Sequence, residues 1–346
     1  MKKILYFLLM LILSFTLAFL IAIKLNLIHI EFINPIKKNA DDYINNGLKL
    51  DDENLSNSNG TEDRFYYNQL SDIAKIIYDK LIDEKDKLKT GTAEIYFLEN
   101  EFDSLLDKNN GMTVLSEEYQ NAADAIRYDN VDLFYIDFTK MALKTITYTR
   151  GRDRSYTVYL APLEENGDYL QDDATKDEVD DMLLAIEERT ATILENANGS
   201  NYQKIQYIHN WLIDNVKYDS TYIKENNRNI YGTLINGEVV CEGYAKTFKY
   251  LMDKLEIPCI IVSGEAVNSE GTSENHMWNY VKINNVWYSV DVTWDDPILL
   301  NDGTLTDEYR YKYFCQGDNI NSNHYLTHTI TDDGQEYELP ELYHKE

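Results

Sequence analysis

Three residue types that together make an activated nucleophile occur between residues 239 and 297. Cys241 lies in VVCEGYAKTF, His276 in ENHMWNYV and Asp291 in WYSVDVTWDDP. An imidazole can take the proton of a neighbouring thiol, and a carboxylate on the other side of the ring fixes the orientation of that ring. Brought together, these residues predict a Cys-His-Asp triad that attacks carbonyl carbon.

Cys241 stands where a predicted helix begins, because Tyr244, Phe248, Leu251 and Leu255 recur at helical spacing. The first turn of a helix has N–H groups without partners and the positive end of the dipole, and both stabilise a thiolate. The same N–H groups can hold a developing oxyanion. Taken alone, this cysteine has a simpler interpretation, which is an inert thiol buried under the helix.

The histidine and the aspartate lie on two predicted strands, 276–283 and 286–294, which an Asn-Asn dipeptide joins. Such a two-residue loop favours a type I′ turn, which pairs Ile283 with Val286. We expect one face of this hairpin to be the core face, and it carries Met277, Asn279, Val281, Ile283, Val286, Tyr288, Val290 and Val292.

The opposite face of the hairpin carries both His276 and Asp291. In the predicted register Trp278 faces Asp291, and Thr293 faces His276. The histidine and the aspartate are therefore diagonal neighbours about 7–8 Å apart, which lets a carboxylate reach an imidazole N–H. Alone, each has a structural interpretation, as a satisfied histidine or as a hydrogen-bonding carboxylate at a strand end. Their coincidence with Cys241 favours catalysis.

Two other residues are weaker candidates for the same site. His209 is a rival base, but it lies on a predicted helix beside Trp211 with no nucleophile in a derivable arrangement. Tyr231 is a weak candidate for the second donor to an oxyanion.

The composition excludes several classes of function. The chain has 346 residues and a net charge of −28, from 60 acidic and 32 basic residues. Such a surface repels nucleic acid, so we expect no nucleic-acid partner. Three cysteines without a C-x-x-C pair predict neither a disulfide framework nor a structural zinc site. No EF-hand loop is present, and we expect neither a metal nor a cofactor.

The N-terminus predicts export. Lys2 and Lys3 precede an uncharged, mostly apolar run at 4–23, which is long enough to cross a bilayer. We therefore expect a signal anchor at 1–24, a single membrane pass and an extracellular catalytic domain. A cleaved signal, which would make the protein secreted, and a buried core helix are the alternatives.

The remaining chain divides by composition into four segments. A flexible acidic linker is predicted at 25–64. An α+β accessory region with a connecting helix follows at 65–195, with strands expected at 93–99, 132–140, 144–150 and 155–161. The catalytic domain is expected at 196–318, and a polar tail at 319–346.

Four segments between 202 and 318 resemble the bacterial transglutaminase-like family, and this region is about a third of the chain. They are IHNWLIDNVKYD, VVCEGYAKTFKYLMDKLEIPC, HMWNYVKINNVWYSVDVTWDDP and YKYF. The region 65–161 is more weakly similar to the segment before this domain in some surface-anchored Gram-positive proteins. Met277 departs from the family, which often has a small residue there.

The resemblance implies an α+β, papain-like transglutaminase core, in which the helix bearing the cysteine packs on an antiparallel sheet bearing histidine and aspartate. Carried over by position, Cys241 is the nucleophile, His276 the general base and acid, and Asp291 its orienting group. The family includes proteases, deamidases and crosslinkers.

We expect a membrane-tethered thiol enzyme that hydrolyses amide bonds of a protein or peptide substrate at the cell surface, with the cell wall as one setting. The alternatives are a protein-crosslinking transglutaminase, a wall amidase, and a non-catalytic surface module that binds through Trp278, Tyr280 and Trp287.

Overall fold

A computed structural model describes residues 64–344, apart from residues 151, 269–270, 297–306 and 333. The predicted anchor at 1–24 and nearly all of the predicted linker at 25–64 lie outside the described residues. Within the described part of the chain, no helix is both long and apolar enough to span a bilayer.

The N-terminal half combines helices with a three-stranded antiparallel sheet of order β1-β3-β2. Ser71 caps α3 by accepting a hydrogen bond from the Ala74 N–H, and the apolar face of α3 buries Ile77 and Leu81. The elements are α3 (Asp72–Asp83), α4 (Lys85–Leu88), β1 (Ile95–Tyr96), α5 (Asp103–Leu106), α6 (Gly111–Asp129), β2 (Met141–Arg150) and β3 (Asp153–Pro162).

The prediction of a strand at 132–140 is wrong. This segment forms two short 3-10 helices, Val131–Leu133 and Phe138–Lys140. The Asp137 side chain accepts a hydrogen bond from the Thr139 N–H and so caps the second of them. Local capping of this kind competes with strand pairing.

Two capped helices lead into the core. The connecting helix α7 (Lys176–Leu194) begins with a capping box between Thr175 and Glu178, and α8 (Asn201–Asn215) begins with one between Ser200 and Gln203. The short strands β4 (Lys217–Tyr218) and β5 (Glu238–Val239) then pair in parallel, with a π-helical turn (Gly232–Asn236) between them.

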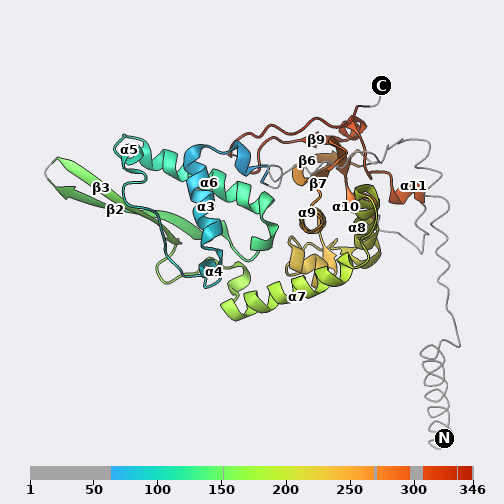
Figure 1. The fold of residues 1–346 in the computed structure, drawn as a ribbon, viewed down its shortest axis with the longest axis horizontal. Coiled ribbons are helices and arrows are strands. Elements are labelled where there is room, and N and C mark those ends of the chain that lie inside the picture. Colours follow the sequence, from blue (N-terminus) through green and yellow to red (C-terminus); the bar gives the residue numbers. More distant parts are fainter. Residues whose placement is uncertain (1–63, 151, 269–270, 297–306, 333, 345–346) are drawn as a thin grey trace, which may run out of the picture. The chain divides into compact units, whose positions relative to one another are not determined.

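The core is an antiparallel sheet of order β8-β7-β6-β9, with α9 (Cys241–Lys254) packed on β6 and β7 (Figure 1). The Asn279 amide fixes this packing, because it donates to the Ala245 carbonyl of α9 at 3.0 Å. The strands are β6 (Cys259–Val267), β7 (Ser273–Ile283), β8 (Val286–Val290) and β9 (His324–Leu326), and the short helices nearby are α10 (Val292–Asp295) and α11 (Asp307–Arg310).

The predicted hairpin register is confirmed, since Ile283 pairs with Val286 and Asn279 with Val290. Both loop residues, Asn284 and Asn285, have positive φ, as a type I′ turn requires. The strand predicted at 286–294 is too long, because β8 ends at Val290 and α10 follows.

The prediction of a single core face is also wrong. Asn279 points toward α9, and Trp278 and Tyr280 on the opposite side of β7 are each only 1% exposed. Trp278 packs edge-on against the ring of His324, which belongs to β9. Both faces of β7 are therefore covered by segments distant in the sequence. The alternation of side chains along the strand does not by itself predict that both faces are buried.

Candidate active site

Cys241 is the first residue of α9, as the helical spacing predicts. The preceding residue, Val240, is extended (φ −93°, ψ 179°), so the helix begins at the thiol itself. Cys241 is half-buried, whereas Cys259 and Cys315 are buried, and burial raises the pKa of both of those thiols. Cys241 is thus the cysteine placed for chemistry, with the first-turn N–H groups of α9 beside it.

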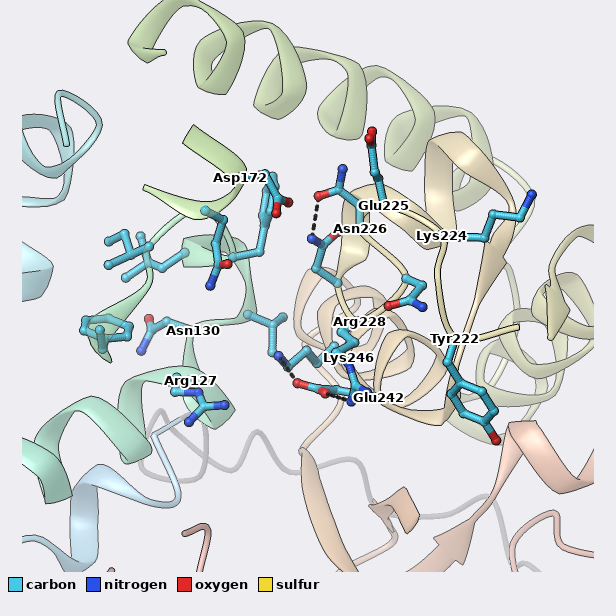
Figure 2. Close-up of a pocket in the computed structure, with 18 of the residues that line it drawn as sticks. Arg127, Asn130, Asp172, Tyr222, Lys224, Glu225, Asn226, Arg228, Glu242 and Lys246 are labelled. Carbon is cyan, nitrogen blue, oxygen red and sulfur yellow. Dashed lines mark hydrogen bonds and ion pairs between the residues drawn. The ribbon is translucent and has the colours of Figure 1, made fainter. Parts of the chain in front are cut away.

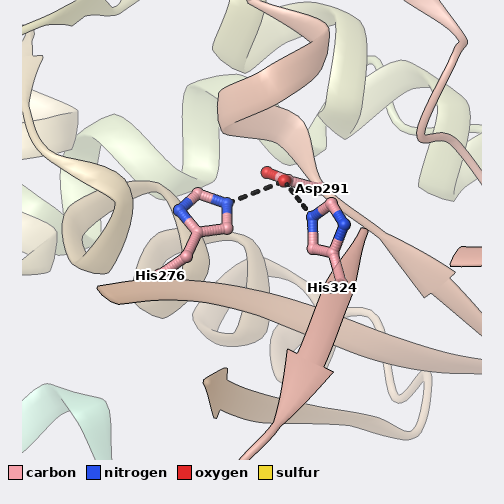
Figure 3. A group of neighbouring side chains, drawn as sticks. All are labelled: His276, Asp291 and His324. Atoms are coloured by element: carbon pink, nitrogen blue, oxygen red, sulfur yellow. Dashed lines mark hydrogen bonds and ion pairs between the residues drawn. The ribbon is translucent and has the colours of Figure 1, made fainter. Parts of the chain in front are cut away.

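His276 links this thiol to Asp291. Nε2 of His276 lies 2.7 Å from Oδ2 of Asp291 (Figure 3). The other ring nitrogen, Nδ1, is then the one left for the thiol, and interaction with Cys241 helps to raise the pKa of the ring. The structure therefore brings together all three residues that the sequence selects.

Asp291 reaches His276 from a helix terminus and not from a strand. It is the N-cap of α10, where its Oδ1 accepts a hydrogen bond from the Trp294 N–H at 3.1 Å. The chain turns at this position, so the predicted strand pair between Asp291 and Trp278 does not form. The cap holds one carboxylate oxygen and leaves the other for the imidazole.

His276 and Asp291 each stabilise the charged form of the other. Burial lowers the pKa of His276, but the Asp291 carboxylate and the Cys241 thiol outweigh burial and raise this pKa to about 10. Burial also raises the pKa of Asp291, yet His276 and His324 hold it below its ordinary value. Near neutral pH the geometry favours an imidazolium between a carboxylate and a thiol, and an imidazolium stabilises a thiolate.

A second histidine, His324, shares the Asp291 carboxylate. Its Nε2 lies 3.1 Å from the same Oδ2, and its Nδ1 lies 2.9 Å from Oδ1 of Asn323 (Figure 3). His324 belongs to β9, at the opposite edge of the sheet from β8, and contacts Asp291 where the chain has already left β8. The segment 319–346, predicted as a polar tail, thus supplies both a strand and a site residue.

Aromatic rings enclose these three polar side chains. The Trp294 ring lies 4.6 Å from the His324 ring and 5.4 Å from the His276 ring, measured between centroids. Trp278 stacks on His276 at 5.9 Å. Apolar walls that exclude water strengthen the electrostatic coupling between Asp291 and the two imidazoles.

The same group has the donor set of a metal site. One ligand atom each from His276, Asp291 and His324 lies within 4.8 Å of the others, in a two-histidine, one-carboxylate arrangement. However, both Nε2 atoms already point at one carboxylate oxygen at hydrogen-bonding distance. A metal needs the lone pairs of those nitrogens, so the observed contacts fit protonated N–H donors better.

The thiol and the imidazole face a common cavity of about 280 Å³. Cys241, His276 and Met277 are among its lining residues, and Ser263 and Gly264 of β6 form another part of its wall. A carbonyl group that enters this cavity reaches both the nucleophile and the base. Met277, which departs from the family pattern, is one of the lining residues.

His209, the rival base, is paired elsewhere. Its Nε2 lies 3.0 Å from Oδ2 of Asp295, and both side chains are fully buried. Burial lowers the pKa of His209 to about 3 and raises the pKa of Asp295 well above its ordinary value. The described residues that line the cavity at Cys241 do not include His209, so its position favours a structural pair.

Tyr218, which the sequence does not single out, interacts electrostatically with the thiol. Residue 218 pairs with Val239 in the parallel β4–β5 ladder, two residues before Cys241. Burial, the Tyr222 hydroxyl and the Cys241 thiol together raise the pKa of Tyr218. Tyr231 instead stacks on Phe134 with ring centroids 6.4 Å apart.

The His276–Asp291 pair should make folding stability depend on pH. The folded pKa of His276 is raised to about 10, against about 6.5 for an unfolded histidine. Its stabilisation is therefore fully present below about pH 6.5 and lost as pH rises towards 10, by about 1.4 kcal/mol per pKa unit at most. Urea unfolding at the two ends of this window measures the loss. His276→Gln should flatten the dependence, and equal slopes in both proteins would contradict the ion pair.

Part of the chain is similar to known proteins. Residues 188–292 match the sequence model of the transglutaminase-like superfamily, a range that includes Cys241, His276 and Asp291 but stops before His324. The human Kyphoscoliosis peptidase is 23% identical over 153 residues, and its mouse counterpart is 24% identical over the same length. Each match covers 41% of this chain and only 22% of the relative, so the chain spans about a fifth of those proteins.

Solved structures with partial similarity include a TGase, at 14% identity over 50% of each chain with a TM-score of 0.31. Another is the periplasmic domain of TgpA from Pseudomonas aeruginosa bound to ethylmercury, at 14% identity over 45% of this chain and 66% of that one, with a TM-score of 0.26. With the match at 188–292, the half-buried cysteine at a helix N-terminus and the histidine on the adjoining sheet, the chain contains a transglutaminase-like core within a mixed helix-and-sheet fold.

Proposed function

We propose that the protein is a thiol enzyme that acts on peptide or side-chain amide bonds, with hydrolysis as its main reaction. The observation that carries this proposal is that His276, bonded to Asp291, lines one cavity together with Cys241 at the N-terminus of α9. Each ring nitrogen of a buried histidine needs a partner, and His276 has a carboxylate on one side and a thiol, a nucleophilic group, on the other.

The geometry supports a two-step reaction. The Cys241 thiolate attacks the amide carbonyl, and the first-turn N–H groups of α9 stabilise the oxyanion. The His276 imidazolium then gives its proton to the leaving nitrogen, the C–N bond breaks and a thioester forms. Neutral His276 next takes a proton from water, which attacks the thioester; the C–S bond breaks, the acid is released, and the thiolate and the imidazolium are restored. An amine in place of water would give a transferred amide.

An assay with casein as substrate distinguishes hydrolysis from transfer to an amine. The full-length protein is incubated with fluorescently labelled casein, dansylcadaverine and reductant, and peptides, incorporated amine and ammonia are measured. Soluble peptides support peptide hydrolysis, and ammonia without incorporation supports side-chain hydrolysis. Incorporation of the amine would overturn the hydrolytic assignment in favour of acyl transfer. If no product forms and the thiol is unreactive, the enzyme proposal fails and a binding module is favoured.

We propose His324 as a positioning residue, because its N–H fixes the oxygen of Asp291 that also holds His276. His324→Leu should lower kcat on casein about tenfold with little change in KM, since orientation and not binding is lost. His324→Gln retains an N–H donor and should recover most of the rate. If both variants lose equal activity and stability, His324 is only structural.

The site of action is proposed as the cell surface, with the body of the protein tethered through residues 1–24. Support comes from Lys2 and Lys3 ahead of the apolar run at 4–23. Protease treatment of intact cells should degrade the protein in the membrane fraction. Protection from protease until the cells are lysed would contradict this proposal.

A further inference from the structure

We propose that a second cavity, next to the Cys241 site, binds a carboxylate group of the substrate through Arg228 and Arg127. This inference rests on the proposed function, since it assigns a substrate class to the same site. The ligand chemistry is that of an acidic peptide, in which either a Glu or Asp side chain or a C-terminal carboxylate supplies the anion.

The second cavity has a volume of about 560 Å³, within the usual range for ligand pockets of about 300–1,000 Å³. Figure 2 shows Arg127 and Asn130 on one side, and Arg228, Glu242 and Lys246 on the other. Arg228 and Glu242 also line the smaller cavity at the thiol, so the two cavities adjoin.

The cavity carries an excess of positive charge where it adjoins the catalytic site. Glu242 holds two cations, with Oε1 2.6 Å from Nζ of Lys246 and Oε2 3.2 Å from an Nη atom of Arg228. Arg127 is a third cation near this carboxylate, and all three cations help to lower the pKa of Glu242 against the effect of burial. With Asp124, which lies 3.6 Å from Arg127, the group has two carboxylates and three cations, and the excess of one positive charge attracts anions.

The two arginines keep donors for a ligand. The Arg228 side chain is 63% exposed, and within the described residues its hydrogen bonding is confined to Glu242, which leaves most of its five N–H donors available. Arg127 is 42% exposed and lies 3.6 Å from Asp124, whose carboxylate also accepts from Thr331 and Gln120. Planar guanidinium groups match the geometry of a carboxylate.

The positive excess is confined to the group around Glu242, because the other charged lining residues are one base, Lys224, and two acids, Asp172 and Glu225. Asp332, a further acid, lines the cavity at the thiol. Lys224 lines the second cavity and is paired with Glu238 at 3.4 Å, outside the lining. Asp172 and Glu225 complete its charged lining and are labelled with Lys224 in Figure 2, apart from the group around Glu242. The chain as a whole carries a net charge of −28, so an acidic peptide is repelled elsewhere and finds cations beside the nucleophile.

Chain connectivity explains why the carboxylate belongs to the substrate of Cys241. Glu242 directly follows the nucleophile, so the cations that it holds lie within a short distance of the reacting carbonyl. An extended peptide advances about 3.3–3.6 Å per residue. A substrate whose carbonyl meets the thiol can therefore place an acidic group, a few residues away, in the second cavity.

The test measures binding without catalysis. Fluorescent, capped Gly-Ala peptides with a central Gln carry Glu-Glu or the neutral Gln-Gln on either side, and a further peptide has only a free C-terminal carboxylate. Anisotropy with the full-length Cys241→Ala protein gives each Kd. We expect one Glu-Glu peptide or the free-acid peptide to bind about tenfold more tightly than the neutral one, as expected for a charge-assisted hydrogen bond. Which peptide binds identifies the source of the carboxylate.

The matched variants are Arg228→Gln, Arg127→Gln and Arg154→Gln, each in the Cys241→Ala background. The first two should reduce the preference to less than about twofold, whereas Arg154, an exposed residue of β3, should not affect it. Equal affinity for acidic and neutral peptides, or a preference that survives both cavity variants, would overturn the proposal. Because this protein lacks the thiol, the result does not depend on whether Cys241 forms a thioester.

Discussion

Cys241→Ala is expected to reduce casein turnover by at least about 10³-fold while leaving the fold intact, because loss of a nucleophile removes the covalent path. The side chain is small and half-buried at the start of α9, so its removal creates little cavity. Release of peptides or ammonia and incorporation of amine measure the activity of the variant, and thermal unfolding shows whether its fold is intact.

Cys259→Ala is the matched control for this prediction. Cys259 is a free cysteine of β6 that burial keeps in its thiol form, with a raised pKa. This control should retain activity within about threefold of the wild type, apart from any loss of stability. A folded Cys241→Ala protein that still turns over casein would remove the nucleophile from the proposal.

Asp291→Asn is expected to lower kcat by about 10²–10⁴-fold with little change in KM, as seen when the orienting carboxylate of a triad loses its charge. Asparagine keeps the shape and can still cap α10 through the Trp294 N–H. It removes the negative charge that raises the pKa of His276. The pH profile of the variant should shift accordingly.

The matched control for this variant is Asp296→Asn. Asp296 lies five positions further along the chain, and its carboxylate accepts from the Tyr244 hydroxyl at 2.5 Å. This substitution should change kcat by less than about threefold. Equal losses from both substitutions would indicate general disruption of this segment and would count against a specific role for Asp291.

Local sequence patterns correctly predict two features of the fold, the start of α9 and the register of the β7–β8 hairpin. Helical spacing after Cys241 places the helix start at the thiol, and the Asn-Asn loop fixes the register of β7 and β8. That register predicts that His276 and Asp291 meet, but the contact is made from the N-cap of α10 and not between diagonal residues of paired strands. The helix start and the register depend on neighbours in sequence, which is why periodicity and turn chemistry are sufficient.

Two features of the site depend on contacts that no local pattern encodes. β8 ends at Val290 because Asp291 caps a short helix, and the following Val-Thr-Trp resembles a strand in composition. His324 lies in a three-residue strand, too short to show alternation, and its contact with Asp291 joins segments 33 residues apart in the sequence. The residues beside it in the sequence, such as Asn323, are polar, so nothing in the sequence indicates that His324 is buried at 1% exposure.

The most direct test of the central claim, that His276 activates the Cys241 thiol, is the rate at which Cys241 is alkylated by iodoacetamide at neutral pH. Peptide mapping by mass spectrometry assigns the adduct in the wild type and in His276→Gln. We predict rapid modification confined to Cys241 in the wild type and a rate at least about tenfold lower in the variant. Equal rates in the two folded proteins would show that the histidine does not activate the thiol, and would contradict the account.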